Sequence, residues 1–260
     1  MLQYFKGLMG SKLAATDGEI GVVREMYFED QEWVMRYLVV ETGSWLTGRQ
    51  VLIAPRALGE VDAQSGTMAV NLSKDQICSA PPIETDKPIS RQYEEQIYEH
   101  YGWLPHWGVP SGGREMILPT SVLTPAPESS ADLQADRPAV PQGDPHLRSS
   151  EEVRGYKFHA QDSEFGHVSD FVLEDSDWRV RYLVISTHQW LPIKHVLVAP
   201  EWIEQISFSQ EQVFINLPRS TIQEAPAFDP GAPISRAYEQ RLHDHYERKG
   251  YWDAVHAARP

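Results

Sequence analysis

The sequence contains a single cysteine, Cys78, in 260 residues. One cysteine excludes an internal disulfide and any zinc site built on several thiolates, and it is typical of a protein from a reducing compartment. Basic residues are few as well, since 23 lysines and arginines stand against 37 aspartates and glutamates, for a formal net charge of −14. This charge repels phosphate backbones, so nucleic acid is not an expected partner.

Long apolar runs are also missing. No run approaches the ~20 apolar residues of a membrane-spanning helix, and the opening residues MLQYFKGLMGSKLA are too short and too interrupted by lysine and glycine for a secretory signal. We therefore expect a cytoplasmic protein without a transmembrane segment, for which peripheral association with a membrane stays open. The motifs GxGxxG, GxxxxGK[ST], GxSxG and HExxH do not occur. The sequence thus predicts no catalytic residue and no cofactor.

What the sequence does have is an internal repeat. RYLVVETGSWL begins at Arg36 and RYLVISTHQWL begins at Arg181, an offset of 181 − 36 = 145 positions. Between Asp17 and Leu58, 18 of 42 positions are identical to their counterparts at this offset. The register continues without a gap to the segments PISRQYE and PISRAYE. Self-similarity over about 100 residues indicates duplicated domains.

The repeat divides the chain into three parts. Residues 1–107 form the first repeat, residues 151–254 form the second, and residues 108–150 lie between them. The middle part contains GVPSGGREM and ADRPAVPQGDP. Such a composition buries too little apolar surface to offset the entropy of ordering the chain. It is therefore predicted to be a linker.

Within each repeat the apolar residues alternate, which predicts strands. In the first repeat the expected strands span residues 12–15, 22–28, 33–41, 50–54 and 68–72. Five short strands without a long helix among them predict a small closed β-barrel. Gly21 and Gly166 open equivalent strands, where a bulge or a close backbone approach is the expected reason for a glycine.

Both faces of the repeated RYLVV and RYLVI strands are apolar. A barrel strand needs only its inner face buried, so the outer face must be covered by something else. One candidate is a short helix after each barrel, with Ser90 or Ser235 as its N-cap. The other is the sister barrel, packed about a pseudo-twofold axis. The residues concerned are Met35, Tyr37 and Val39 in the first repeat and Val180, Tyr182 and Val184 in the second.

Two tryptophans and two arginines are repeated beside these strands. As interaction residues, Trp45 and Trp190 would be aromatic anchors of a partner interface, with Arg36 and Arg181 as charged neighbours. As structural residues, the tryptophans would close the barrel ends and the arginine stems would pack beside them. Both interpretations stay open, and the two tryptophans join the six residues above as interface candidates.

Histidines are the candidate metal ligands. His188 and His195 occur only in the second repeat and would meet near Asp170 or Glu164 if the loop between them folds back. Lone surface histidines are the alternative, and we predict no metal. His243 and His245 would point about 200° apart on a helix, so we expect both on its surface rather than on one ion.

Carboxylates gather in the predicted hairpin turns of both repeats. A solvated hairpin tip accounts for them, because they lack the glycine and the terminal glutamate of an EF-hand calcium loop. We therefore predict neither an acid–base pair nor a calcium site there. The residues are Glu29, Asp30 and Glu32 in the first repeat and Glu174, Asp175 and Asp177 in the second.

The repeated segments resemble the PRC-barrel, the β-barrel of the cytoplasmic part of the photosynthetic reaction-centre H subunit and of the C-terminal domain of the ribosome maturation factor RimM. The resemblance lies in DGEIGVVREMYFEDQEWVMRYLVVETGSWLTGRQVLIAPRALG and DSEFGHVSDFVLEDSDWRVRYLVISTHQWLPIKHVLVAPEWI. It covers both repeats and leaves out the linker. It implies a mainly β fold of two small SH3-like barrels, related by internal duplication and each followed by a short helix, in a stand-alone bacterial protein.

The same resemblance implies a non-catalytic module that binds other proteins, an adaptor with no catalytic residue to carry over. A homodimer through the outer sheet faces is a further expectation. One alternative is a peripheral accessory of a membrane electron-transfer complex, as in photosynthesis with the H subunit. The other is a metal- or proton-binding protein that uses the histidines of the second repeat. The identity of the partner stays open.

Overall fold

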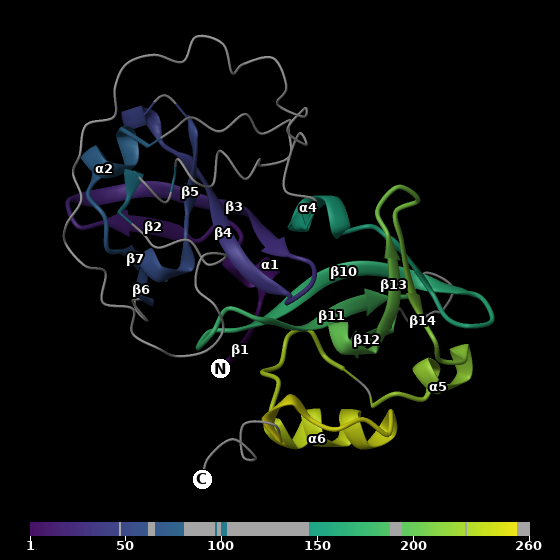
Figure 1. The fold of residues 1–260 in the computed structure, drawn as a ribbon. Coiled ribbons are helices and arrows are strands. Elements are labelled where there is room, and N and C mark those ends of the chain that lie inside the picture. Colours follow the sequence, from purple (N-terminus) through teal and green to yellow (C-terminus); the bar gives the residue numbers. More distant parts are fainter. Residues whose placement is uncertain are drawn as a thin grey trace, which may run out of the picture.

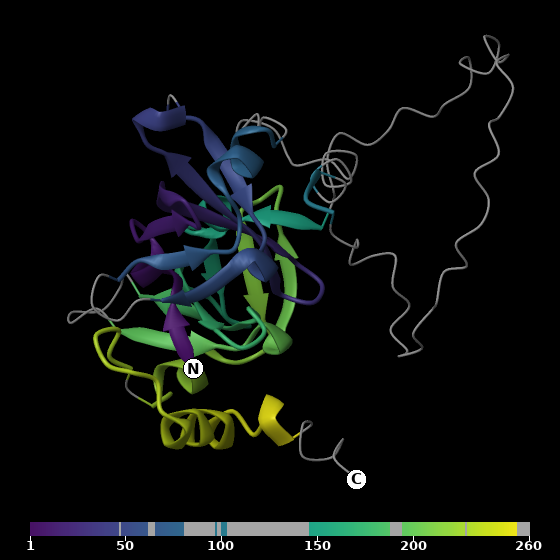
Figure 2. The same cartoon turned by 90° about the vertical axis from the view of Figure 1, so that its left-hand side faces the viewer.

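The computed structural model describes residues 1–46, 48–61, 66–80, 97, 100–102, 146–187, 194–226 and 228–253. The protein is mainly β, as predicted, with two mixed sheets of seven strands each. Figure 1 shows the sheets side by side, with α6 below the second one, and Figure 2 shows the first sheet in front of the second. None of the helices in the described ranges is long and apolar enough to cross a bilayer.

The first sheet has the strand order β5-β4-β3-β2-β7-β6, and β8 joins it at β3. Neighbouring strands are antiparallel except for β2 and β7, which are parallel. Its strands are β2 (Lys12–Ala15), β3 (Gly18–Glu29), β4 (Val34–Thr42), β5 (Gln50–Ile53), β6 (Leu58–Val61), β7 (Met68–Val70) and β8 (Leu147–Ser149). The short helices of the first repeat are α1 (Phe5–Leu8), which contacts the second sheet, and α2 (Lys74–Cys78), η1 (Ser44–Leu46) and η2 (Pro55–Ala57).

The second sheet repeats this order as β12-β11-β10-β9-β14-β13, and β1 joins it at β10. Here β9 and β14 are the parallel pair. Its strands are β1 (Leu2–Tyr4), β9 (Lys157–His159), β10 (Glu164–Glu174), β11 (Val180–Ser186), β12 (His195–Val198), β13 (Ile203–Ser207) and β14 (Gln212–Ile215). The helices of the second repeat are α4 (Ser150–Val153), which contacts β3 of the first sheet, and α5 (Arg219–Gln223), α6 (Arg236–His245) and η4 (Pro200–Trp202).

Each sheet takes its seventh strand from the other repeat. β1 pairs with β10, with Leu2 opposite Glu174, and β8 pairs with β3, with Leu147 opposite Glu29. The two pairings are equivalent, because 147 − 2 and 174 − 29 both equal 145. The repeats therefore exchange strands about a pseudo-twofold axis.

The ends of the two long hairpins are also joined across this axis. The backbone N–H of Val180 donates to the carbonyl of Trp33 at 2.7 Å, and that of Met35 donates to the carbonyl of Trp178 at 2.9 Å. Both tryptophans have a left-handed backbone, with φ of 56° and 57°, which is uncommon for a bulky side chain. The chain thus accepts two strained residues at the point where the repeats meet.

The two sheets share one apolar core. One cluster of buried side chains extends from Phe5 and Phe28 in the first repeat to Phe171 and Leu242 in the second. The ring centroids of Phe28 and Phe171 lie 5.4 Å apart. A fully buried large apolar side chain contributes about 1.5 to 3 kcal/mol, so each repeat depends on the other for part of its stability.

Several local predictions are confirmed. The five strands predicted in the first repeat correspond to β2, β3, β4, β5 and β7. A Cβ at Gly21 or Gly166 would overlap the carbonyl oxygen of Glu41 or Ser186, which is the expected close backbone approach. Ser235 caps α6, and its Oγ accepts from the N–H of Tyr238 at 3.2 Å. Its predicted counterpart, Ser90, lies outside the described residues.

Other predictions need correction. β6 was not predicted, and neither were the exchanged strands β1 and β8. Most of the predicted linker, residues 108–150, lies outside the described residues. Its last five residues, 146–150, form β8 and the start of α4. The second repeat therefore begins earlier than residue 151. The sequence did not indicate this, because a strand of three residues is too short to show alternation.

The Ser150→Ala substitution tests the dependence of one repeat on the other. Ser150 Oγ accepts the buried N–H of Met26, in the opposite repeat, at 3.0 Å. Losing this acceptor should lower the free energy of unfolding by about 1–3 kcal/mol, and both sheets should unfold in one transition. Chemical denaturation followed by tryptophan fluorescence and circular dichroism measures both quantities. Ser79→Ala, which removes an exposed hydroxyl, is the control. Unchanged stability in Ser150→Ala, or two separate transitions, would contradict the expectation.

Candidate binding groove between the repeats

Six of the eight predicted interface residues are buried in the protein. Met35, Tyr37, Val39, Val180, Tyr182 and Val184 are each at most 3% exposed. Trp45 is half-buried and donates from Nε1 to the carbonyl of Ile20 at 2.5 Å, as the structural interpretation expects. Trp190 lies outside the described residues. A second protein therefore cannot reach the six strand residues as an exposed surface.

In the first repeat, side chains from later parts of the chain cover the outer face of β4. Tyr37 and Val39 pack in a small buried cluster with Leu52 of the neighbouring strand β5. Ile97 and Leu147 of β8 belong to the same cluster, together with Tyr27 and Ala54. The exchanged strand thus covers an outer face as well as extending the sheet.

In the second repeat the cover is α6, which brings polar groups onto Tyr182. The hydroxyl of Tyr182 donates to Glu239 Oε1 at 2.9 Å and lies 3.0 Å from His243 Nε2. Tyr251 donates to the same Glu239 oxygen at 2.9 Å, and Arg236 Nη1 lies 3.0 Å from Glu239 Oε2. Burial raises the pKa of Tyr182 far above its ordinary value and lowers the pKa of His243.

The prediction that His243 and His245 lie on the helix surface is wrong for His243, whereas His245 is half-buried. His243 is 1% exposed, and its Nε2 lies 3.0 Å from the buried Tyr182 hydroxyl. His245 Nε2 donates to the carbonyl of Thr221 at 2.8 Å and so connects α6 to α5. His100, the counterpart of His245 in the first repeat, makes the same bond to Gln76. The two histidines on α6 therefore act structurally and separately.

Two cavities adjoin where the hairpin end of the first repeat lies on the second. A cavity of about 390 Å³ is lined by Arg179, Arg181, Glu201 and Tyr251, among others. A cavity of about 350 Å³ is lined by His146, Arg148, Glu204 and Phe208, among others. Gln31, Trp33 and Pro200 line both cavities. We call the joined space the inter-repeat groove.

The guanidinium groups of the groove already have carboxylate partners. Arg181 lies 2.6 Å from both Glu174 and Asp177 and stacks over the ring of Tyr251 at 4.2 Å. Arg148 donates to Asp30 at 2.8 Å and stacks over Phe208 at 3.5 Å.

By contrast, two carboxylates that line the groove have no guanidinium partner among the described residues. Glu201 and Glu204 are exposed, and neither forms an ion pair within the described part of the chain. The uncompensated charge of the groove is therefore negative.

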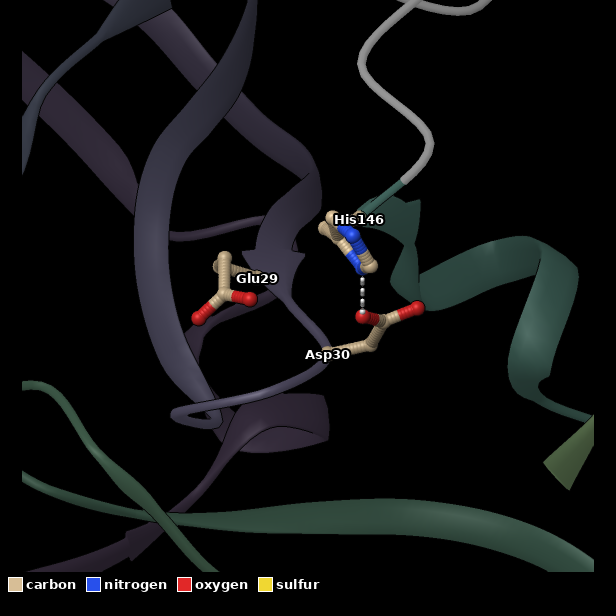
Figure 3. Close-up of side chains that lie close together, drawn as sticks. All are labelled: Glu29, Asp30 and His146. Atoms are coloured by element: carbon tan, nitrogen blue, oxygen red, sulfur yellow. Dashed lines mark hydrogen bonds and ion pairs between the residues drawn. The ribbon is translucent and has the colours of Figure 1, made fainter. Parts of the chain in front are cut away.

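Glu29, Asp30 and His146 gather at the edge of the groove, with one ligand-type atom of each within 4.8 Å of the others (Figure 3). His146 Nδ1 lies 3.0 Å from Asp30 Oδ1, and the second oxygen of Asp30 accepts from Arg148. The carboxylate of Glu29 accepts the backbone N–H groups of Gln31 and Glu32 at 2.8 and 2.7 Å. A cation would compete with all of these bonds, so the cluster serves to fix β8 on the first repeat.

This cluster corrects the prediction of a solvated hairpin tip for Glu29 and Asp30, whereas Glu32, Asp175 and Asp177 are exposed as predicted. The side chains of Glu29 and Asp30 are 13% and 10% exposed. Sequence reasoning missed the cluster because His146 was assigned to the linker, 146 − 30 = 116 positions after Asp30. The signal that could have found it is the equivalence of residues 146–150 with residues 1–5 at the repeat offset.

The described residues include only one member of the predicted histidine pair. His188 lies outside the described residues. His195 begins β12 opposite Ser186, which itself lies opposite His167 rather than Asp170. Asp170 is buried and accepts the N–H of Lys6 at 3.0 Å. Within the described ranges, the one group of three ligand-type side chains close enough for a metal does not include His195.

Comparison with known proteins adds little. No family model matches the chain. An uncharacterized protein from Deinococcus radiodurans is 31% identical over 85 residues, which are 32% of this chain. The match spans 30% of that protein's length.

The buried His243 predicts a pH dependence of stability. Its folded pKa lies below the ordinary value of 6.5 because burial disfavours the charged ring. Between the folded and unfolded pKa values the unfolded state binds more protons, so stability should fall as the pH drops below about 6.5. The free energy of unfolding measured from pH 7.5 to 5 should fall less steeply in His243→Asn than in the natural protein. Equal slopes would contradict this assignment.

Proposed function

We propose that the protein is a non-catalytic tandem PRC-barrel protein that binds other proteins as an adaptor, and that partners bind in the inter-repeat groove. The single observation that carries this proposal is the groove itself. It is formed by both repeats, and its lining combines aromatic and aliphatic side chains with exposed carboxylates. The apolar outer faces, in contrast, are covered within the chain.

In this proposal each sheet closes into a small barrel of the PRC type. The same strand order in both sheets supports it, as do the parallel pairs β2–β7 and β9–β14. The register shifts near Gly21 and Gly166 support it further, since bulges and close approaches are typical of strands that bend round a barrel.

A binding role fits the polar groups of the groove better than catalysis does. Arg148 and Arg181 are occupied by carboxylates, and His243 donates from Nδ1 to the carbonyl of Lys249 at 2.9 Å while its Nε2 lies beside the Tyr182 hydroxyl. A tyrosine whose pKa is raised by burial is a poor base or nucleophile at neutral pH. These side chains therefore stabilise the fold. Recognition of a partner would then depend on the shape and the charge of the groove.

The other interpretations stay predictions. An accessory role in a membrane electron-transfer complex rests on the resemblance, and no feature of the described residues favours it. Metal binding would need His195 or the cluster in Figure 3, whose ligand-type atoms are already bonded. A homodimer would need surfaces other than the six buried strand residues. The proposed setting is the cytoplasm, where Cys78, an exposed free thiol, stays reduced.

Photo-crosslinking in the native host tests the proposed function. A photoreactive phenylalanine analogue is placed at Gln205, which is exposed and lines the groove, or at Glu224, which is exposed and does not line it. The groove position should give discrete adducts with another protein, and the control position should not. The same adducts at both positions, or none at Gln205, would contradict binding in the groove.

A further inference from the structure

Two strand edges border the groove. β13 is the last strand of its sheet and pairs with β14 alone, while β8 pairs with β3 alone, within the described residues. Both line the cavity of about 350 Å³, β13 through Ile203 to Ile206 and β8 through Arg148. An unpaired edge presents backbone N–H and C=O groups that can pair with a further strand.

The floor between these edges is partly apolar. Trp33, Ile206 and Phe208 are half-buried and line the cavity, so each keeps part of its side chain open to the groove. Side chains on one face of an extended chain recur at every second residue. A strand lying along β13 would therefore place alternate side chains on this floor.

The charge of the groove distinguishes between possible segments. Four carboxylates line it, against three guanidinium groups, and Arg181 is neutralised by Glu174 and Asp177 from outside the lining. Glu201 lies two residues before β13, and Glu204 lies within it. Both are exposed, and neither forms an ion pair in the described ranges. The four lining carboxylates are Asp30, Glu32, Glu201 and Glu204, and the three guanidinium groups belong to Arg148, Arg179 and Arg181.

We propose that the groove takes an extended, basic segment of a partner protein, which adds to the free edge of β13 as a further strand. Backbone hydrogen bonds to β13 supply affinity, and alternate apolar side chains on Trp33, Ile206 and Phe208 supply fit. Lysine or arginine side chains on the other face reach Glu201 and Glu204. This inference rests on the proposed function and adds the chemistry of the partner.

Fluorescence anisotropy with the full chain tests the charge preference. The probes are two fluorescein-labelled peptides of ten residues, one alternating lysine with valine and the other alternating glutamate with valine. The lysine peptide should bind saturably and at least about tenfold more tightly than the glutamate peptide. Equal binding of both peptides, or tighter binding of the acidic one, would overturn the proposal.

A pair of charge-matched double variants locates the binding. Glu201→Lys with Glu204→Lys should weaken the lysine peptide at least about tenfold. Glu224→Lys with Glu247→Lys changes the net charge by the same amount at exposed positions outside the groove lining, and should leave the affinity unchanged. Circular dichroism checks that both variants keep the fold. If both pairs weakened the affinity for the lysine peptide equally, only the overall charge of the protein would matter, and binding in the groove would be refuted.

Hydrogen exchange separates strand addition from attachment through charge alone. Bound lysine peptide should slow amide exchange in residues 203–207 of β13, whereas attachment through side chains alone would leave these amides unchanged and refute strand addition. If crosslinks form at Gln205 but the lysine peptide does not bind, this inference fails and the proposed function stands. If neither is seen, both fail.

Discussion

The reciprocal backbone pairing between the repeats is the interaction on which the rest of the structure depends. β1 and β8 have three residues each, and strands of this length have little stability unless a sheet receives them. Each finds that sheet in the opposite repeat. The hairpin ends then meet through the carbonyls of Trp33 and Trp178. Two domains that sequence similarity alone would treat as separate are thereby joined into one folding unit.

This arrangement also decides which surfaces a partner can use. The exchanged strand β8 and the helix α6 cover the apolar outer faces, so Tyr37 and Tyr182 are fully buried. The same crossing places Trp33 of the first repeat against Pro200 of the second, where the groove forms. The covers formed by β8 and α6 thus remove the apolar outer faces from recognition, and joining the repeats creates a mixed surface between two strand edges.

Features with a local cause could be predicted from the sequence. The repeated apolar runs RYLVV and RYLVI located β4 and β11, and Ser235 marked the start of α6 because its side chain caps the next turn. The glycines were explained by a close approach of backbones within one repeat. Each of these depends on residues a few positions apart or on one repeated register.

Features with a tertiary cause could not be predicted. A strand such as β8 is too short to show a period, and its partner lies more than a hundred positions away. His146 contacts Asp30 only because that strand crosses to the other repeat. His243 is buried only because Tyr182 places a hydroxyl in an apolar face that α6 covers. The binding groove depends on both repeats at once, so no pattern in either repeat indicates it.

The most direct test of the account is hydrogen exchange of the natural protein measured at increasing denaturant. If the strand exchange joins the repeats into one unit, the slowest amides of β3 and β10 should converge on the same opening free energy and lose protection together. The account would be contradicted if the amides of one sheet exchanged freely at a denaturant concentration where those of the other sheet were still protected.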